Sequence, residues 1–290
     1  MSIRVFAPAK VNLTLEVGLP RSDGRHPLAS LVMFADIGDA VFVREADALT
    51  LTTRGPFAAA LADEPDNLVL RAARLLQSEA GGQARGAAIQ LDKQLPIASG
   101  IGGGSSDAAA TLKALSELWE LSLTESDLCA LGARLGADVP ACIVARAGFM
   151  SGAGETFTPL NAPPLHVVLA NAGIPISTAE AYRAFDAREL GRPRLGASPA
   201  PLGDDGDVVT LCKTIGNDLE DLACALEPSI ADVRAAMCSA EGVRYVALSG
   251  SGGTWFALMD DAKAAEALAN ELAAEHPQWW ARAGLLGGAS

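Results

Sequence analysis

The sequence lacks the features that mark secreted, metal-clustering or membrane-spanning proteins. Its five cysteines are scattered and contain no C-x-x-C pair, which argues against structural disulfides and against a zinc cluster. The N-terminus has no apolar segment of the secretory type, and no uncharged apolar run approaches the ~20 residues of a membrane span. We therefore expect a cytoplasmic protein of a reducing compartment.

Positive charge is also scarce. The formal net charge is −13, and a nucleic-acid surface needs a concentrated basic stripe. The excess of acidic over basic residues therefore argues against nucleic acid as a partner. It does not exclude a small anionic ligand, which needs only a few local donors.

Several familiar catalytic patterns are missing as well. A Walker A loop requires Gly-Lys-Ser/Thr, but Gly104 is followed by Ser105. The Rossmann pattern beginning at Gly100 would need a glycine at 105, and the G-x-S-x-G elbow of serine hydrolases is absent here and at 249–253. These absences exclude the commonest nucleotide and hydrolase signatures, although not every phosphate-binding loop.

The chain has 290 residues, and half of them are hydrophobic. This predicts a sizeable core in one large domain or two medium ones. Strand-like and helix-like segments are interspersed, which predicts an α/β fold with mixed sheets (α+β). Strands are expected near 29–35, 40–53, 87–91, 142–145, 166–170, 243–248 and 254–259. Helices are expected near 66–80, 105–119, 124–136, 177–190, 217–227, 229–240 and 260–275, with a connector at 191–207.

The segment after the N-terminus alternates apolar and polar residues from Val11 to Val17, which predicts a half-buried strand. Lys10 shares parity with the polar set, so it should project from the same face as Asn12. Both side chains could then reach one ligand.

A glycine-rich segment lies between an expected strand and an expected helix. Consecutive backbone amides together with a helix N-terminus favour phosphate, although a glycine run by itself is more often a turn. The residues that would hold the phosphates are Pro96, Ile97, Ala98, Ser99, Gly100, Ile101, Gly102, Gly103, Gly104, Ser105 and Ser106.

Three separated motifs together resemble the GHMP kinase superfamily of small-molecule kinases. They lie at 8–13, at 96–109 and at 248–254. Within the superfamily, the segments 9–13, 21–26 and 135–140 are similar to the kinases that act on 4-diphosphocytidyl-2-C-methyl-D-erythritol. The resemblance runs from about residue 4 to about 260 and is weakest at 190–240.

The resemblance implies a two-domain fold with the active site in the interdomain cleft, and domains at 1–160 and 161–290. It implies transfer of phosphate from ATP, with Mg²⁺, to the 2-hydroxyl of the cytidine diphosphate ester of methylerythritol. That reaction is a step of the non-mevalonate route to isoprenoid precursors. The glycine segment would wrap the ATP phosphates.

Asp138 aligns with the family's catalytic aspartate, and Lys10 with its cationic partner. Phosphoryl transfer to an alcohol needs a group that accepts the hydroxyl proton, and a nearby cation keeps a carboxylate ionised. The plain alternatives are a turn residue before Val-Pro for Asp138 and a solvated lysine for Lys10.

For the acceptor, the resemblance implies that His26 reads the cytosine edge and that Asn12 lies near the methylerythritol. Tyr182 would stack on the base, or would pack in the core of its helix. Arg25 stands where the family commonly has an aromatic residue, and a guanidinium plane can also stack on a base. Gly250 and Ser251 of the third motif would support the substrate.

Magnesium has the weakest candidate ligands, Ser105 or Ser106. Lys93 could meet the ATP phosphates, but we expect it to be exposed at a strand end. The alternatives that remain are another GHMP kinase acting on homoserine or a sugar, and a non-catalytic ligand sensor of the same fold. A serine hydrolase is disfavoured by the missing elbow and by a total of three histidines. Either a monomer or a homodimer is compatible with the sequence.

Overall fold

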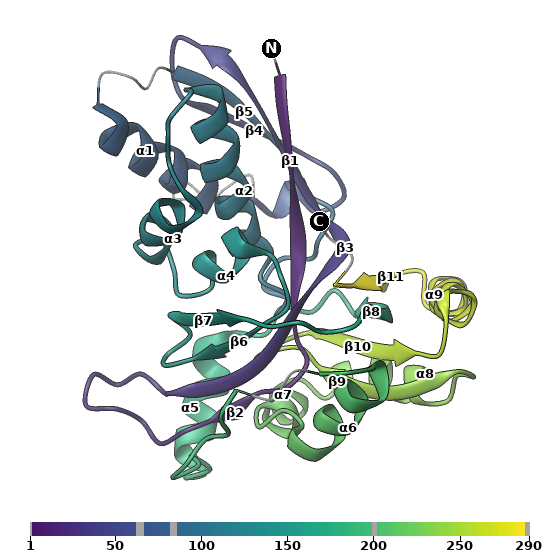
Figure 1. Ribbon diagram of the computed structural model, residues 1–290. Coiled ribbons are helices and arrows are strands. Elements are labelled where there is room, and N and C mark those ends of the chain that lie inside the picture. Colours follow the sequence, from purple (N-terminus) through teal and green to yellow (C-terminus); the bar gives the residue numbers. More distant parts are fainter. Residues whose placement is uncertain (1, 62–66, 82–85, 199–201, 288–290) are drawn as a thin grey trace. The chain divides into compact units, whose positions relative to one another are not determined.

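A computed structural model describes residues 2–61, 67–81, 86–198 and 202–287 (Figure 1). The chain forms two compact units that interleave along the sequence. The first unit contains residues 1–9, 38–97 and 102–145, and the second contains residues 10–37, 98–101 and 146–290. Strands β1 (Ser2–Asn12) and β3 (Leu28–Ala46) each contribute to both units.

The domain division at residue 160 stays a prediction, and the compact units differ from it. Residues 10–37 group with the C-terminal half because β1 and β3 are long enough to leave one unit and enter the other. The sequence predicts two strands at 29–35 and 40–53, whereas β3 is a single strand of 19 residues.

The first unit contains a sheet in the order β4-β5-β3. Strand β5 (Gly86–Asp92) pairs antiparallel with β3 and parallel with β4 (Thr50–Arg54). Ala87, Ile89 and Leu91 alternate along β5 and are buried, as a strand with one face on the core requires.

The helices of the first unit gather beside this sheet in Figure 1. They are η1 (Ala58–Leu61), α1 (Leu68–Ala80), α2 (Gly103–Leu118), α3 (Glu125–Ala133) and α4 (Val139–Val144). Thr124 and Asp127 form the predicted capping box of α3. Asn67 caps α1, and the predicted cap Asp66 lies outside the described residues.

One element of the first unit was assigned wrongly from the sequence. The apolar run at 142–145 predicts a strand, but residues 142–144 belong to α4, Ala145 is its C-cap, and the helix has a proline in its first turn. A short apolar run has no readable periodicity, and proline in the first turn favours a helix.

The second unit is built on an antiparallel sheet in the order β9-β10-β8-β11. These strands are β8 (Leu165–Asn171), β9 (Val243–Leu248), β10 (Thr254–Met259) and β11 (Trp280–Leu286). Short strands β2 (Glu16–Val17) and β6 (Gly148–Ser151) pair with β3, and β7 (Thr156–Pro159) pairs with β6.

The described part of the second unit contains five helices. They are α5 (Thr178–Ala187), α6 (Asp205–Ile215), α7 (Glu220–Leu226), α8 (Ile230–Cys238) and α9 (Ala262–Glu275). Buried Trp255, Leu248 and Leu268 belong to the core cluster that joins β9, β10 and α9. Neither α6 nor β11 was predicted, and α6 begins within the connector expected at 191–207. Helices α5, α7, α8 and α9 and strands β8, β9 and β10 lie close to their predicted positions.

The mixed α/β class predicted from the sequence is confirmed. Within the described ranges, no helix combines the length and the apolar character that crossing a bilayer requires.

Candidate active site

The N-terminus of α2 presents backbone amides that no side chain caps. Gly102 precedes the helix in the left-handed conformation (φ 64°), and the first turn contains no acidic side chain. The first amides of a helix have no acceptor within it, and the helix dipole adds positive potential there. This end of α2 therefore has the chemistry of an anion site, as the glycine-rich segment predicts.

Gly104 adds free space at the same helix end. A Cβ built on it would have no atom within 4 Å apart from its chain neighbours and the nearby backbone of α2 itself. The amide of residue 104 can therefore be approached closely, which is what a triphosphate needs. The residues present fit a bound nucleotide on this observation.

The earlier part of the glycine segment, Ala98–Ile101, belongs to the second unit and is tightly packed. Gly100 has a φ of 78°, and a Cβ there would collide with the carbonyl oxygens of Ser249 and Gly252. The Gly100 carbonyl also accepts a hydrogen bond from Ser249 Oγ at 3.0 Å. Gly100 thus allows two main-chain loops to approach closely, which requires the absence of a side chain.

The two serines that open α2 differ in accessibility. Ser106 is buried, and its hydroxyl donates to the Pro8 carbonyl at 2.5 Å. Ser105 is half-buried. Of the two predicted magnesium ligands, Ser105 is therefore the more accessible.

No group of three His, Cys, Asp or Glu residues that could hold a metal occurs in the part of the chain that the structure describes. A serine hydroxyl is a hard oxygen ligand, and Mg²⁺ usually keeps waters and substrate phosphates as its other ligands. The residues present therefore fit a magnesium ion that is held mainly by a nucleotide.

Lys93 is buried, so its predicted exposure is wrong. Only 2% of its surface is accessible, and its Nζ lies 2.6 Å from Asp39 Oδ2 and 2.7 Å from Asp107 Oδ2. A lysine is rarely fully buried unless it is paired, and here two carboxylates from different elements provide the pairing.

Burial shapes the ionisation of this cluster. Desolvation raises the pKa of Asp107 to about 7, against the opposing attraction of Lys93. Burial lowers the pKa of Lys93, but the attraction of Asp107 and Asp39 more than offsets it, so the net shift is upward. Asp107 Oδ1 is buried without a hydrogen-bond partner. The upward shift in the pKa of Lys93 means that its two carboxylate partners keep the amine charged.

Asp138 is half-buried and directly precedes α4. Its side chain makes no capping hydrogen bond to that helix, while its carbonyl accepts from Cys142 N at 3.1 Å. Asp138 lies in the turn that precedes α4, so the plain alternative of a turn residue is not excluded by its position.

Lys10 and Asn12 lie on one face of β1, as their parity predicts. Lys10 Nζ donates to Asn12 Oδ1 at 3.1 Å, and Asn12 Nδ2 donates to Ser30 Oγ at 2.7 Å. Ser30 Oγ in turn donates to the Thr14 carbonyl at 2.6 Å. The amide of Asn12 is therefore oriented by a buried chain of hydrogen bonds.

The predicted half-buried strand at 11–17 is wrong in one respect. The polar positions Asn12, Thr14 and Glu16 are buried together with the apolar ones. Thr14 Oγ1 accepts from Leu31 N at 2.9 Å, so the polar side chains find their hydrogen bonds inside the protein. The predicted strand is also interrupted at residues 13–14, so that β1 ends at Asn12 and β2 begins at Glu16, and each of them pairs with β3.

His26 is buried among aromatic side chains. Its ring centroid lies 5.2 Å from that of Tyr182 and 5.8 Å from that of Phe185. Nδ1 lies 2.8 Å from the Gly18 carbonyl oxygen and Nε2 lies 3.1 Å from Asp186 Oδ1. The structure thus brings together His26 and Tyr182, two residues that the sequence assigns to the same base.

Arg25, by contrast, is exposed, and its backbone amide donates to Asp23 Oδ1 at 3.0 Å. The turn at 21–25 therefore orients the main chain beside His26.

The third motif forms a tight loop between β9 and β10. Gly250 has a φ of 60°, and its carbonyl accepts from Asn217 Nδ2 at 2.8 Å. Ser251 Oγ lies 2.7 Å from Thr178 Oγ1. Asn217 was not singled out from the sequence, and its position after Gly216 carries no signal of this long-range contact.

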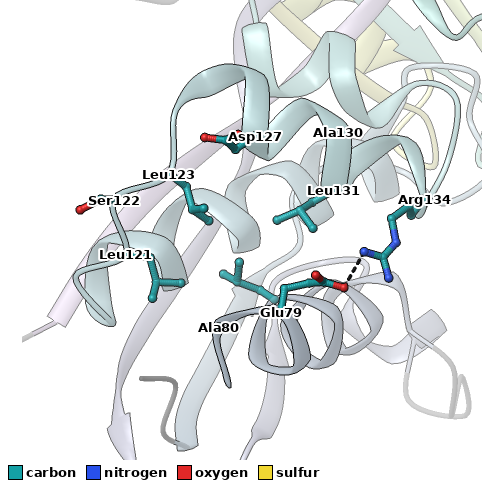
Figure 2. Close-up of a pocket in the computed structure, with 10 residues that line it drawn as sticks. Glu79, Ala80, Leu121, Ser122, Leu123, Asp127, Ala130, Leu131 and Arg134 are labelled. Carbon is teal, nitrogen blue, oxygen red and sulfur yellow. Dashed lines mark hydrogen bonds and ion pairs between the residues drawn. The ribbon is translucent and has the colours of Figure 1, made fainter. Parts of the chain in front are cut away.

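The first unit also contains a groove that is lined by other residues than those described above. Figure 2 shows a groove along α1 and α3 whose lining includes Leu121, Leu123 and Leu131, with an ion pair between Glu79 and Arg134. None of the predicted site residues lines it.

Comparison with known proteins places the chain in a family. The GHMP kinases N terminal domain model matches residues 67–146, and the GHMP kinases C terminal model matches residues 203–278. A 4-diphosphocytidyl-2-C-methyl-D-erythritol kinase of Parvibaculum lavamentivorans is 46% identical over 283 residues, 97% of each chain. The chain belongs to the 4-diphosphocytidyl-2-C-methyl-D-erythritol kinase family. It is an ATP-dependent small-molecule kinase of the GHMP type.

Other relatives agree with this family. A 4-diphosphocytidyl-2-C-methyl-D-erythritol kinase of Cereibacter sphaeroides is 47% identical, over 95% of this chain and 96% of its own. A solved 4-(cytidine 5'-diphospho)-2C-methyl-D-erythritol kinase superposes with a TM-score of 0.78 at 34% identity, over 99% of this chain and 100% of its own.

A homoserine kinase of Cytophaga hutchinsonii superposes with a TM-score of 0.65 at 20% identity, over 98% of this chain and 94% of its own. At that identity the likeness concerns the fold alone. The mixed α/β GHMP kinase fold predicted from the sequence is confirmed for this member of the 4-diphosphocytidyl-2-C-methyl-D-erythritol kinase family.

Sequence reasoning missed the residues that support the predicted ones. Ser30, Ser249 and Asn217 orient side chains or loops of the second unit, and Asp39 and Asp107 surround Lys93. Asp39 offered one usable signal, since it is an acidic residue inside an apolar strand run. A charge at such a position needs a buried partner.

Proposed function

We propose that this chain transfers the γ-phosphoryl group of ATP to the 2-hydroxyl of 4-diphosphocytidyl-2-C-methyl-D-erythritol, a step toward isoprenoid precursors. Relatives of that name, 46–47% identical over nearly the whole chain, support this acceptor. A cytoplasmic location and a monomeric or homodimeric state stay predictions.

The observation that carries the choice of acceptor is the aromatic environment of His26. The His26 ring lies 5.2 Å from the Tyr182 ring, so an imidazole and an aromatic face stand side by side, an arrangement that suits the edge and face of a flat heterocycle. The Nε2 atom, 3.1 Å from the half-exposed Asp186 carboxylate, would exchange that contact for the base. Homoserine and galactose contain no such ring. His26 would read the cytosine edge, Tyr182 would stack on it, and Arg25 would border the base.

The nucleotide would bind through the glycine-rich segment. The uncapped amides at the start of α2, from Gly103 to Ser105, would donate to phosphate oxygens. Ser105 would offer a hydroxyl to the magnesium ion. ATP supplies the phosphoryl group, and Mg²⁺ neutralises charge on the phosphates.

Asp138 would accept the proton of the acceptor hydroxyl. The family to which the chain belongs supports this role, because Asp138 stands in the segment 135–140 that resembles these kinases. Lys10 would stabilise the developing alkoxide, and Asn12, oriented by Ser30, would hold the methylerythritol part. Gly250 and Ser251 would support the substrate from the third motif.

The rival acceptors are homoserine and a sugar, and a further rival is a ligand sensor without activity. The homoserine kinase likeness supports only a shared fold, at 20% identity. A sensor should have lost the base, the lysine or the uncapped helix end, and Asp138, Lys10 and the glycine segment are all retained.

A coupled ADP-release assay tests the proposal. The purified chain is given ATP and Mg²⁺ with the cytidine ester, homoserine, mevalonate or galactose in parallel. We expect turnover with the cytidine ester and little with the others. Faster turnover of homoserine or a sugar would replace the proposed acceptor, and no turnover of any acceptor with retained ADP binding would favour the sensor.

A further inference from the structure

A buried ion pair ties together the two sides of the glycine-rich segment. Lys93 directly follows β5 and precedes the segment, while Asp107 lies in the second turn of α2, beyond it. Their contact, 2.7 Å from Nζ to Oδ2, therefore closes a loop of the chain that contains Pro96 to Ser106. Both residues are at least 97% buried, so solvent does not screen the contact.

Asp39 connects the Lys93–Asp107 ion pair to strand β3. One carboxylate oxygen accepts from Lys93 Nζ at 2.6 Å, and the other accepts from the backbone amides of Gln94 and Leu95 at 2.6 and 2.8 Å. Three donors thus converge on one side chain of β3. The main chain that enters the glycine segment is held against the sheet by these bonds.

Gly103 leaves the room that the amine needs. A Cβ built on Gly103 would lie 3.0 Å from Lys93 Nζ and 3.7 Å from Asp39 Oδ2. The amine is therefore packed directly against the first residue of α2. The position of that helix end, and so of its free amides, depends on where the amine is held.

Stability alone is a poor account of this cluster. Burying three ionisable groups has a large desolvation cost, and apolar replacements of similar volume are often as stable or more stable. A cluster of this kind is better explained by the geometry that it imposes on the chain around it.

We propose that Lys93, Asp39 and Asp107 form a clamp that sets the spacing of the glycine segment and thereby positions the α2 amides for the nucleotide phosphates. The clamp residues are positioning residues and do not touch the nucleotide. This inference rests on the proposed binding of ATP by the segment from Pro96 to Ser106.

The test is ADP binding by titration calorimetry on the full chain, without acceptor. Asp107→Leu removes the acceptor atoms at similar volume, and Asp107→Asn keeps an oxygen that Lys93 can bond. We expect roughly tenfold or greater weakening of ADP binding for Asp107→Leu, since small misplacements of binding groups have large effects. Asp107→Asn should stay within about twofold of wild type, because the hydrogen bond persists.

Arg54→Met is the matched control. Arg54 pairs with Asp92 at 2.9 Å beside the same strand end, but about half of its side chain is exposed. Its loss should leave ADP binding unchanged, because exposed ion pairs contribute little. A double variant, Lys93→Met with Asp107→Leu, removes opposite charges together and serves if Asp107→Leu alone does not fold.

Thermal unfolding of each variant separates positioning from folding. Wild-type ADP affinity in folded Asp107→Leu, or in the double variant, would overturn the clamp even if the melting temperature fell. Failure of the wild type to bind ADP would overturn it too. Because no acceptor is present, a wrong choice of alcohol in the proposed function would leave this result unaffected.

Discussion

The two compact units handle polar groups in contrasting ways. The first unit buries full charges, with Lys93 between two carboxylates, and leaves the start of α2 without a side-chain cap. In the second unit, the buried Lys10 ammonium donates to Asn12, and the chain of hydrogen bonds continues through the uncharged groups of Asn12 and Ser30. The first arrangement suits a highly charged ligand, and the second suits hydroxyls and amide-like groups.

This contrast indicates a division of labour. Substitutions near α2 should change nucleotide binding, and those around His26 should change binding of the acceptor. Asp138 should affect the chemical step itself. The following changes test that division, and a variant of the second unit that altered only ATP affinity would break it.

Asp138→Asn should have the largest effect. An asparagine of the same shape cannot accept the hydroxyl proton, so we expect kcat to fall by about 10²–10⁴-fold, the usual contribution of a general base. ADP binding and the melting temperature should stay near wild type, because asparagine keeps the size and shape of a side chain that is only half-buried. Steady-state kinetics together with calorimetry measure both. Wild-type turnover in this variant would remove Asp138 as the base.

Gly100→Ala should have the largest effect on stability. Alanine is strained at a φ of 78°, and its Cβ would collide with two backbone oxygens, which cannot move as a flexible side chain would. We expect a loss on the order of 3 kcal/mol in the free energy of unfolding. Urea denaturation measures it. A change below about 1 kcal/mol would show that the loops at 98–101 and 249–253 separate easily.

His26→Ala should raise KM for the cytidine ester by roughly tenfold or more and leave KM for ATP unchanged, since a lost base contact affects one substrate. Phe185→Leu is a useful control, because it changes the packing against the His26 ring and leaves the imidazole in place. Equal changes in both KM values for His26→Ala would contradict its assignment to the acceptor.

Gly104→Ala should have the smallest effect on stability. The position is helical and open, so alanine should raise the free energy of unfolding by up to about 1 kcal/mol. Gly103→Ala should not share the gain, because its Cβ meets the Lys93 amine at 3.0 Å. Urea denaturation of the two variants compares them directly, and equal gains would show that the amine is free to shift.

Much of the fold could be read from local signals. The capping residues Thr124 and Ser177 mark helix starts that the structure contains, and the apolar run at 166–170 marks β8. The strand predicted at 142–145 was wrong, because a short apolar run suits a strand and a buried helix equally. The parity of Lys10 and Asn12 on β1 was correct because side chains alternate strictly along a strand.

The sequence by itself determined the family, the mixed α/β class and the glycine-rich segment, because these depend on residue types and local spacing. Only the tertiary structure decided that Lys93 is buried between Asp39 and Asp107, and that Gly100 and Gly104 have opposite surroundings. Burial of a charge depends on partners 14 and 54 positions away along the chain. Such contacts form only when the sheet and α2 fold together, and no local pattern encodes them.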